Sequence, residues 1–318
     1  MNRRILFINA TILTCLCIAT MTTGCNDASN SSWYKKFNWK AEEFFDDSKV
    51  IALCKAIEAK DLDEIDRLVA DGADVNAKGK GNMTPLLWAF PENKPEVFKR
   101  ILEHGADPNV EVTSDFNTRM SGILPGDSAL HLAAGTAFPN YFKYVMQHGG
   151  DPNLICRIEW KQSPLITVIT GSCPNKKEAI QLLIDAGADL DYVSTTGSTA
   201  LRRAVTRGGQ YNIALQLLKA GASFNICAID GGTVIHMVLR EEKLLPQVSE
   251  QQKKDYMELF ELLKAKGADI EGARKDIEAW SNGGKPSPAR IAELKKRSED
   301  DLAMKKAARE KNEDAKKE

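Results

Sequence analysis

Histidine and cysteine are the side chains in this chain best suited to act as bases, nucleophiles or metal ligands. The sequence has four histidines and seven cysteines. Metal sites and nucleophilic sites need such residues at characteristic short spacings or beside a partner base. No CxxC pair, His/Cys cluster, Gly-x-Ser-x-Gly elbow, phosphate-binding loop or HExxH sequence occurs. We therefore expect a protein that is not an enzyme and that holds no metal or cofactor.

The bulk composition limits the classes of partner. The chain has 318 residues, 43% of them hydrophobic, a formal net charge of −1 and a pI near 6.5. The apolar fraction is enough for a packed core. The nearly neutral charge gives no overall field that would attract nucleic acid or an acidic membrane, so we expect no nucleic-acid partner.

One short phrase recurs six times along the chain. Each copy follows an apolar helical run and consists of glycine, a small residue and usually aspartate. Successive copies are 33, 44, 38, 34 and 46 residues apart. A repeat length near 33 residues, increased by insertions between some repeats, is typical of stacked helical units that bind other proteins along an open face. The copies begin at Gly72, Gly105, Gly149, Gly187, Gly221 and Gly267.

A second motif opens five of the units with Thr or Ser followed by an apolar helical start. The hydroxyl can cap the helix, and a proline at the first helical position has no amide to leave unsatisfied. The glycine of the closing phrase permits the left-handed residue that ends the second helix. The openings are Thr84-Pro85-Leu86, Ser128-Ala129-Leu130-His131, Ser163-Pro164-Leu165, Thr199-Ala200-Leu201 and Thr233-Val234-Ile235-His236.

These openings resemble the Thr-Pro-Leu-His-x-Ala motif of ankyrin repeats, and the closings resemble the family's Leu-Leu-x-x-Gly-Ala-Asp. The resemblance covers about residues 46–276. It implies an all-α ankyrin-repeat solenoid of about six helix-turn-helix units with hairpin loops, followed by a charged helical tail. Insertions at 110–125, 171–175 and 243–254 interrupt the pattern, and insertions in arrays often map to the binding face. We expect the 110–125 insertion to project from the same edge as the other hairpins.

The N-terminus has the layout of an export signal. Arg3 and Arg4 precede an apolar run over residues 5–20, and Thr22-Thr23-Gly24-Cys25 follows. A cysteine after small residues resembles the lipobox of bacterial lipoproteins, although Thr22 stands where leucine is usual. The resemblance implies acylation of Cys25 and a periplasmic, lipid-anchored protein. Asn26 in place of aspartate favours the outer membrane over the inner one, and a plain cleaved signal is the alternative.

We divide the chain into a signal peptide at 1–24, a tether and N-terminal capping segment at 25–45, the repeat domain at 46–276, and a linker with a charged helical tail at 277–318. Trp33, Phe37 and Phe44 can share one helical face, which fits either a cap on the first unit or an interfacial membrane helix. We favour the cap. The charged segment after residue 288 is interpreted as a solvated or frayed helix, or alternatively as a tail that contacts peptidoglycan or a partner.

The histidines and cysteines have structural interpretations within such an array. His131 and His236 occupy the motif's own His position, where the side chain usually bonds backbone groups. His104 and His148 each precede the Gly that ends a second helix, where an imidazole can favour the helix terminus. Units are spaced too far apart for most cysteine pairs to bond, so we expect mostly buried free thiols at Cys54, Cys156, Cys173 and Cys227.

In ankyrin arrays the hairpin tips and the exposed side of the first helices form a concave binding surface. By register with the family, Trp160 is the most prominent candidate there, because aromatic residues dominate binding energy. Trp88 lies inside the opening motif, so we expect it in the core. The full set of candidate protein-binding residues is Lys80, Met83, Glu92, Phe116, Arg119, Ile123, Leu124, Asp127, Trp160, Gln162, Thr170, Ser198, Arg207, Asp230 and Arg240.

Among bacterial ankyrin lipoproteins, one recurring role is immunity against a membrane-attacking phospholipase delivered by type VI secretion. The resemblance therefore implies a monomeric, membrane-tethered module that binds such an effector on its concave face and occludes it. One alternative is a scaffold or accessory factor for a resident envelope or oxidative-stress enzyme, since some exported ankyrin proteins accompany catalases. A further alternative is an unrecognised hydrolase.

Overall fold

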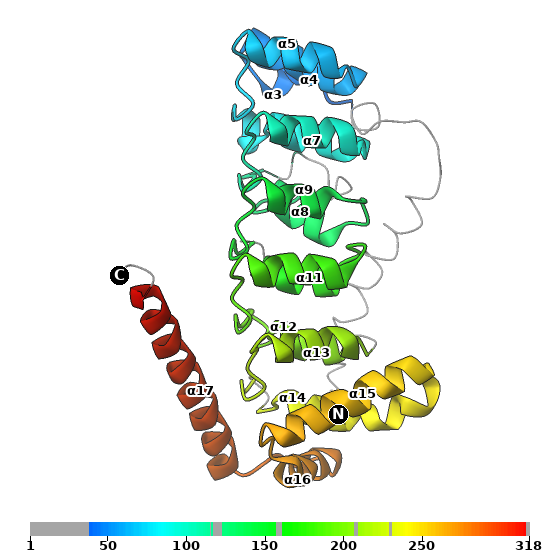
Figure 1. The fold of residues 1–318 in the computed structure, drawn as a ribbon, viewed down its shortest axis with the longest axis vertical. Helices are drawn as coiled ribbons and strands as arrows, with labels where there is room; N and C mark the ends of the chain where they lie inside the picture. The colour runs from blue at the N-terminus through cyan, green and yellow to red at the C-terminus, as the bar shows by residue number, and fades with distance from the viewer. Residues whose placement is uncertain are drawn as a thin grey trace, which may run out of the picture. The chain divides into compact units, whose positions relative to one another are not determined.

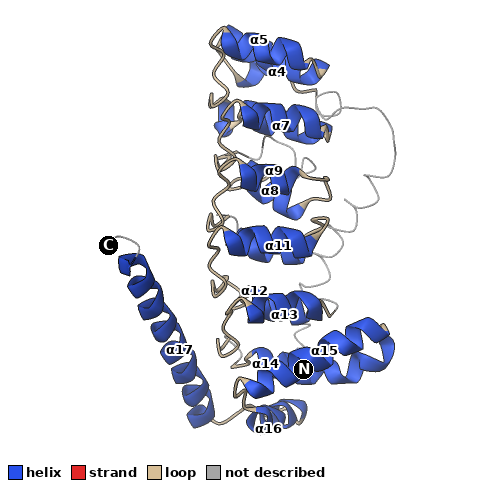
Figure 2. Cartoon of the chain, viewed as in Figure 1, coloured by secondary structure: helices blue, strands red, loops and turns tan. Residues whose placement is uncertain are grey.

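The computed structural model describes residues 38–114, 116, 123–156, 161–206, 209–228 and 231–315. The chain divides into two units, residues 1–40 and 41–318, and the described helices belong to the second. Its described residues form helices joined by loops, with no β-strand among them (Figure 2). The predicted signal peptide, Cys25, the tether and the aromatic residues Trp33 and Phe37 lie outside the described residues.

Pairs of short helices follow one another and stack in chain order (Figure 1). Neighbouring first helices contact each other along most of the stack, as do all neighbouring second helices. This arrangement confirms the predicted solenoid of helix-turn-helix units. The pairs are α4 (Ser48–Ala59) with α5 (Leu62–Ala70), α6 (Pro85–Ala89) with α7 (Pro95–Glu103), α8 (Ala129–Gly135) with α9 (Tyr141–Gln147), α10 (Pro164–Thr170) with α11 (Lys176–Asp185), α12 (Ala200–Thr206) with α13 (Tyr211–Lys219), and α14 (Val234–Glu241) with α15 (Glu250–Ala265).

The local signals in the sequence set the helix ends as predicted. The Thr84 hydroxyl accepts a hydrogen bond from the Leu87 amide at 3.2 Å, and Ser128 and Ser163 cap α8 and α10 in the same way. Every glycine that opens a closing phrase has a φ between +83° and +97°, the left-handed region that side chains disfavour. The caps begin the first helices, and the glycines end each second helix and turn the chain towards the next unit.

The N-terminal end of the stack is closed by aromatic packing. The short helix α3 (Ala41–Phe44) places the Phe44 ring 5.3 Å from the ring of Trp88, and the Phe45 ring lies 6.2 Å from it. Trp88 is fully buried, which confirms its predicted core position, and its indole nitrogen donates to Glu58 at 3.1 Å. Residues 41–45 therefore cover the apolar side of the first units, as a cap would.

Asparagine side chains tie each unit to the next at the turn after the second helix. The Asn76 side-chain amide donates to the Gly105 carbonyl at 2.9 Å, and its carbonyl accepts from the Asp107 amide at 2.7 Å. We call this pair of bonds an asparagine rung. The same rung recurs at Asn109, which bonds Gly149 and Asp151, and at Asn153, which bonds Gly187 and Asp189.

The C-terminal region departs from the sequence interpretation. Asp269, in the last closing phrase, accepts from the Gly272 amide and caps α16 (Ile270–Ser281), which packs on α14. After the loop at 282–287, α17 (Pro288–Ala315) buries Leu294 and Ser298. The expectation of a solvated helix is therefore correct for most side chains of α17 and wrong for the face that carries Leu294 and Ser298, which are buried.

The remaining described helices are the short 3-10 turns η1 (Lys80–Asn82), η2 (Phe90–Glu92) and η3 (Glu242–Gln247). A bilayer-spanning helix needs about 20 predominantly apolar residues. None of the helices in the described ranges has that combination of length and apolar character.

Candidate protein-binding surface

Hairpin loops between successive units form one edge of the stack, which we call the finger side. Each hairpin is closed by a backbone hydrogen bond at a matching position, and the hairpins therefore form a regular series. The closing amides and carbonyls are Gly79 with Met83 at 2.8 Å, Val112 with Asp127 at 2.8 Å, Cys156 with Gln162 at 3.0 Å, Ser194 with Ser198 at 3.1 Å, and Ala228 with Gly232 at 3.0 Å.

Four predicted binding residues remain accessible on this series of hairpins. Lys80 is exposed, Leu124 is 42% exposed, and Gln162 and Ser198 are half-buried. We call Lys80, Leu124, Gln162 and Ser198 the finger row. Leu124 is the large hydrophobic side chain of the row, so it is the member with most apolar surface to offer a partner.

Three other predicted surface residues are buried. Met83 is 0% exposed, Ile123 1% and Asp127 8%, so the expectation that they lie on the open surface is wrong. Met83 and Asp127 directly precede the cap residues of α6 and α8. Gln162 and Ser198 precede cap residues in the same way and are only half-buried, so the position before a cap does not by itself separate buried from exposed side chains.

Three more candidates contact other residues of the array. The Glu92 side chain is largely buried and pairs with Lys60 at 3.6 Å, and the Thr170 hydroxyl donates to the Ile166 carbonyl at 2.9 Å. Arg240 is exposed, but its guanidinium lies 4.6 Å from the ring centre of Trp280 on α16. Arg119, Trp160, Arg207 and Asp230 lie outside the described residues, so their roles remain predictions.

The base of the 110–125 insertion lies against the preceding hairpin. The Thr113 amide donates to the Gly81 carbonyl at 2.9 Å, and the Asn82 side chain donates to the Glu111 carbonyl at 3.1 Å. The half-buried Phe116 ring lies 5.7 Å from the Phe44 ring. The insertion thus links two neighbouring hairpins to the N-terminal cap, and the predicted projection of its tip falls on residues outside the described ranges.

The buried Asp127 fixes the backbone of the exposed Leu124 through hydrogen bonds. The Asp127 amide donates to the Leu124 carbonyl at 2.9 Å, and the Leu124 amide donates to the Asp127 carboxylate at 2.9 Å. Gly126 within this turn has a φ of +93°. Cys156 of the next hairpin lies 3.6 Å from the other carboxylate oxygen. Asp127 therefore positions the finger row, although it is not itself on the surface.

Burial raises the pKa of Asp127 to about 6, although its bonds with the Leu124 amide and the Cys156 thiol lower the pKa. The folded protein then binds a proton that the unfolded chain releases between about pH 4 and pH 6, so this residue makes the fold less stable as pH rises through that window. We expect its contribution to the unfolding free energy to fall by on the order of 3 kcal/mol between pH 4 and pH 7. Urea unfolding of the wild type and Asp127→Asn across this range measures it, because other groups cancel in the difference. A difference that does not change with pH would contradict the assignment.

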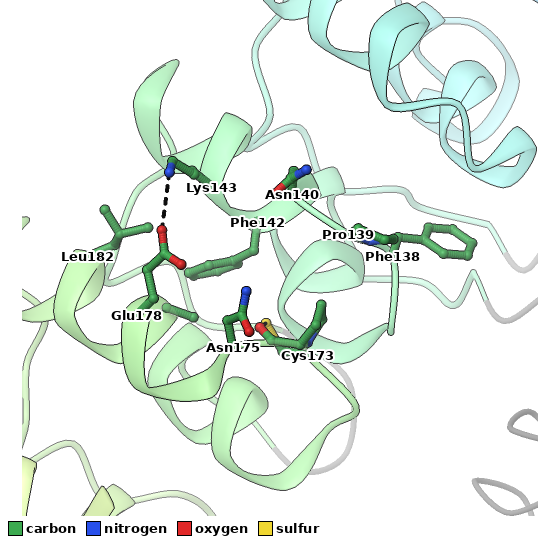
Figure 3. A pocket seen from close by; sticks show the side chains of 11 residues that line it. Phe138, Pro139, Asn140, Phe142, Lys143, Cys173, Asn175, Glu178 and Leu182 are labelled. Carbon is green, nitrogen blue, oxygen red and sulfur yellow. Dashed lines mark hydrogen bonds and ion pairs between the residues drawn. The ribbon is translucent and has the colours of Figure 1, made fainter.

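The opposite end of the helices carries a small pocket between the third and fourth units (Figure 3). Its volume is about 70 Å³, and Lys143 and Glu178 form an ion pair at its rim at 3.2 Å. Burial raises the pKa of the Cys173 thiol in its wall to about 11, which disfavours the reactive thiolate. The pocket is lined by Phe138, Pro139, Asn140, Phe142, Lys143, Cys173, Pro174, Asn175, Glu178, Ala179 and Leu182.

Thr233, His236 and Asp276 have the residue types of a nucleophilic triad, but they are 5%, 0% and 6% exposed. The His236 Nδ1 accepts from the Thr233 amide at 3.1 Å, and Nε2 lies 3.1 Å from the Asp276 carboxylate. Burial lowers the pKa of His236 despite the neighbouring carboxylate. Thr233 and His236 cap α14, and Asp276 joins this helix to α16 through its bond with His236. The expected bonding of His236 to backbone is therefore correct at Nδ1 and wrong at Nε2.

The other histidines and the cysteines follow their structural interpretations. His131 Nε2 lies 3.0 Å from the Leu154 carbonyl, which confirms its predicted bond inside the array. His104 and His148 stand at the C-caps of α7 and α9. No His, Cys, Asp and Glu cluster suited to a metal ion occurs in the described ranges. None of the four predicted thiols is in a disulfide, and three of them are buried while Cys227 is half-buried.

Comparisons with known proteins agree with this geometry. Residues 130–228 match the family model of ankyrin repeats in three copies. Over 63 residues, 20% of the chain, the sequence is 40% identical to the mitochondrial disaggregase of Homo sapiens, and it spans 9% of that protein's length. It is 30% identical over 90 residues, 28% of the chain, to the putative ankyrin repeat protein R664 of Acanthamoeba polyphaga mimivirus, spanning 54% of its length.

A solved ankyrin repeat domain from Acinetobacter baumannii AYE is similar in fold, with a TM-score of 0.52 and 24% identity. The likeness covers 68% of this chain and 97% of that one. Together with the stacked helix pairs, the capped openings and the left-handed glycines, these matches establish that the chain carries ankyrin repeats and that its described residues fold as an ankyrin-repeat solenoid.

Proposed function

We propose that this protein is a binding module that captures another protein on its finger side. Ankyrin-repeat arrays typically serve as interaction scaffolds, and their repeats present an extended surface to a partner. The observation that carries the proposal is the finger row, in which hairpins closed by matching backbone bonds present Lys80, Leu124, Gln162 and Ser198. Leu124 lies in a turn that is fixed by the hydrogen bond from its amide to the Asp127 carboxylate, so binding needs little further ordering of that side chain.

The more specific proposal is an immunity protein that is exported, lipid-anchored at Cys25 on the periplasmic side of the outer membrane, and specific for a phospholipase toxin delivered by type VI secretion. The motifs at residues 1–25 support export and anchoring. A tethered inhibitor meets such a toxin where its lipid substrate lies, and the finger side would occlude the toxin's active-site mouth.

Co-purification and kin competition test this function together. The mature protein, isolated from membranes of cells facing toxin-producing kin, is expected to retain a secreted phospholipase. Cells that lack the gene are expected to be killed by their kin and rescued by the wild type. Indifference of the deletion strain to its kin would contradict immunity. Retention of a resident envelope enzyme and of no toxin would instead favour the scaffold function.

We expect Leu124→Asp to weaken binding of the captured partner by at least about tenfold, because the substitution places a charge within the apolar part of the covered surface. Met257 on α15 is 53% exposed and belongs to a second helix, away from the hairpins, so Met257→Asp is the matched control. Calorimetric titration of both variants measures the effect. Equal affinity of the two variants would exclude Leu124 from the interface.

A further inference from the structure

The fourth rung of the asparagine series differs in chemistry from the three before it. Asp191 occupies the position of Asn76, Asn109 and Asn153, and its carboxylate accepts from the Ser223 amide at 2.6 Å. A carboxylate has no hydrogen to donate, so it cannot make the second bond of the rung, to the Gly221 carbonyl. The sequence therefore leaves this rung one donor short.

Lys305 of α17 supplies the missing donor. Its ammonium nitrogen lies 2.8 Å from the second Asp191 oxygen and 2.6 Å from the Gly221 carbonyl. The Asp191 side chain is 6% exposed and the Lys305 side chain 27%, so this ion pair is partly shielded from water. A charge-assisted bond of this kind is stronger than the amide bond it replaces. The rung is thus completed by a residue 114 positions further along the chain.

The rest of the contact between α17 and the hairpin before α14 combines hydrogen bonds with a buried apolar side chain. The Cys227 amide donates to the Ser298 hydroxyl at 3.3 Å, and the Ser223 hydroxyl donates to the Asp301 carboxylate. Leu294 is buried. Leu294, Ser298, Asp301 and Lys305 recur at the spacing of one helix face, so a single face of α17 makes these contacts.

These contacts place α17 on the finger side of the array, beside the fifth and sixth units (Figure 1). The helix covers the hairpin that contains Ser223 and Cys227, and the finger row is accessible with the helix in place. A second ionic contact, Arg290 with Asp269 at 2.7 Å and Asp276 at 3.0 Å, holds the start of the helix to α16. The loop between α16 and α17 contains Gly283 with a φ of +75° and Gly284.

We propose that α17 is a latch over the finger side, closed by the Lys305–Asp191 rung and released by swinging about the loop at 282–287. The closed latch shields the hairpin before α14 and leaves the finger row open. Release uncovers Ser223 and Cys227 and extends the open surface towards the sixth unit. The consequence for partner binding rests on the proposed function, whereas the latch itself does not.

Hydrogen exchange of the full chain tests the latch with Asp191→Asn. Asparagine at this position can donate to Gly221 itself, as in the other rungs, and it removes the charge that holds Lys305. We expect amides of residues 292–305 to exchange at least about tenfold faster, while those of α12 and α13 keep their protection. Lys305→Met should release α17 to the same degree and should also loosen the turn at Gly221, which loses its donor.

Lys306→Met is the matched control, because Lys306 is the exposed neighbour of Lys305. We expect the amides of α17 to exchange in this variant at the same rate as in the wild type. Unchanged protection of α17 in both Asp191→Asn and Lys305→Met would overturn the latch. The readout needs no partner, so failure of the latch and failure of the proposed function are distinguishable.

Discussion

Replacing Trp88 with alanine is expected to lower the free energy of unfolding by about 3–5 kcal/mol. The indole is fully buried, packs edge-on against Phe44 and Phe45, and donates to Glu58. Alanine would leave a cavity between the cap and the second unit, and it would deprive a carboxylate of a donor. Burial already raises the pKa of Glu58, so loss of that bond adds to the cost of its charge.

Urea unfolding followed by circular dichroism measures this loss, and Trp280→Ala is the matched control. Trp280 is only half-buried on α16 and packs against His236 and Arg240. Its truncation is expected to cost clearly less than that of Trp88. A loss below about 1 kcal/mol for Trp88→Ala would show that residues 41–45 do not form a packed cap.

Replacing Tyr141 with alanine is expected to cost a similar amount, about 3–5 kcal/mol, and to separate the stack into two unfolding units. The Tyr141 ring is buried and stacks on Phe98 with centroids 4.1 Å apart, and it meets Phe90 edge-on at 5.2 Å. Phe90 and Phe98 belong to the second unit and Tyr141 to the third, so this cluster carries much of the joint between them.

Tyr141→Phe keeps the stacked ring and is expected to cost less than about 1 kcal/mol. Loss of coupling in Tyr141→Ala would appear as two urea transitions where the wild type and Tyr141→Phe show one. A single cooperative transition with an unchanged midpoint in Tyr141→Ala would show that the joint does not depend on this cluster.

The regular part of the fold was predictable from sequence because its signals are local. A hydroxyl before five of the first helices and a glycine after each second helix act through bonds within a few residues of themselves. Thr84 and Gly72 therefore behave as their types and positions indicate. The core position of Trp88 followed from the same register, since the opening motif directs that residue towards the neighbouring units.

The parts that sequence reasoning missed depend on contacts between distant residues. Nothing near Lys305 indicates that it completes a rung at Asp191, and the helix α16 begins at an aspartate that had opened a hairpin in earlier units. The burial of Met83 and Ile123 was missed because family register gives a position along the hairpin but not the direction of each side chain. Binding roles within the finger row are set by a partner and remain predictions.

Binding of a protein on the finger side can be tested by hydrogen exchange of the mature chain with and without its captured partner. We expect slower exchange in the hairpins that contain Lys80, Leu124, Gln162 and Ser198, with little change in α5, α7, α9 and α11. Protection confined to those second helices, with the hairpins unchanged, would contradict it.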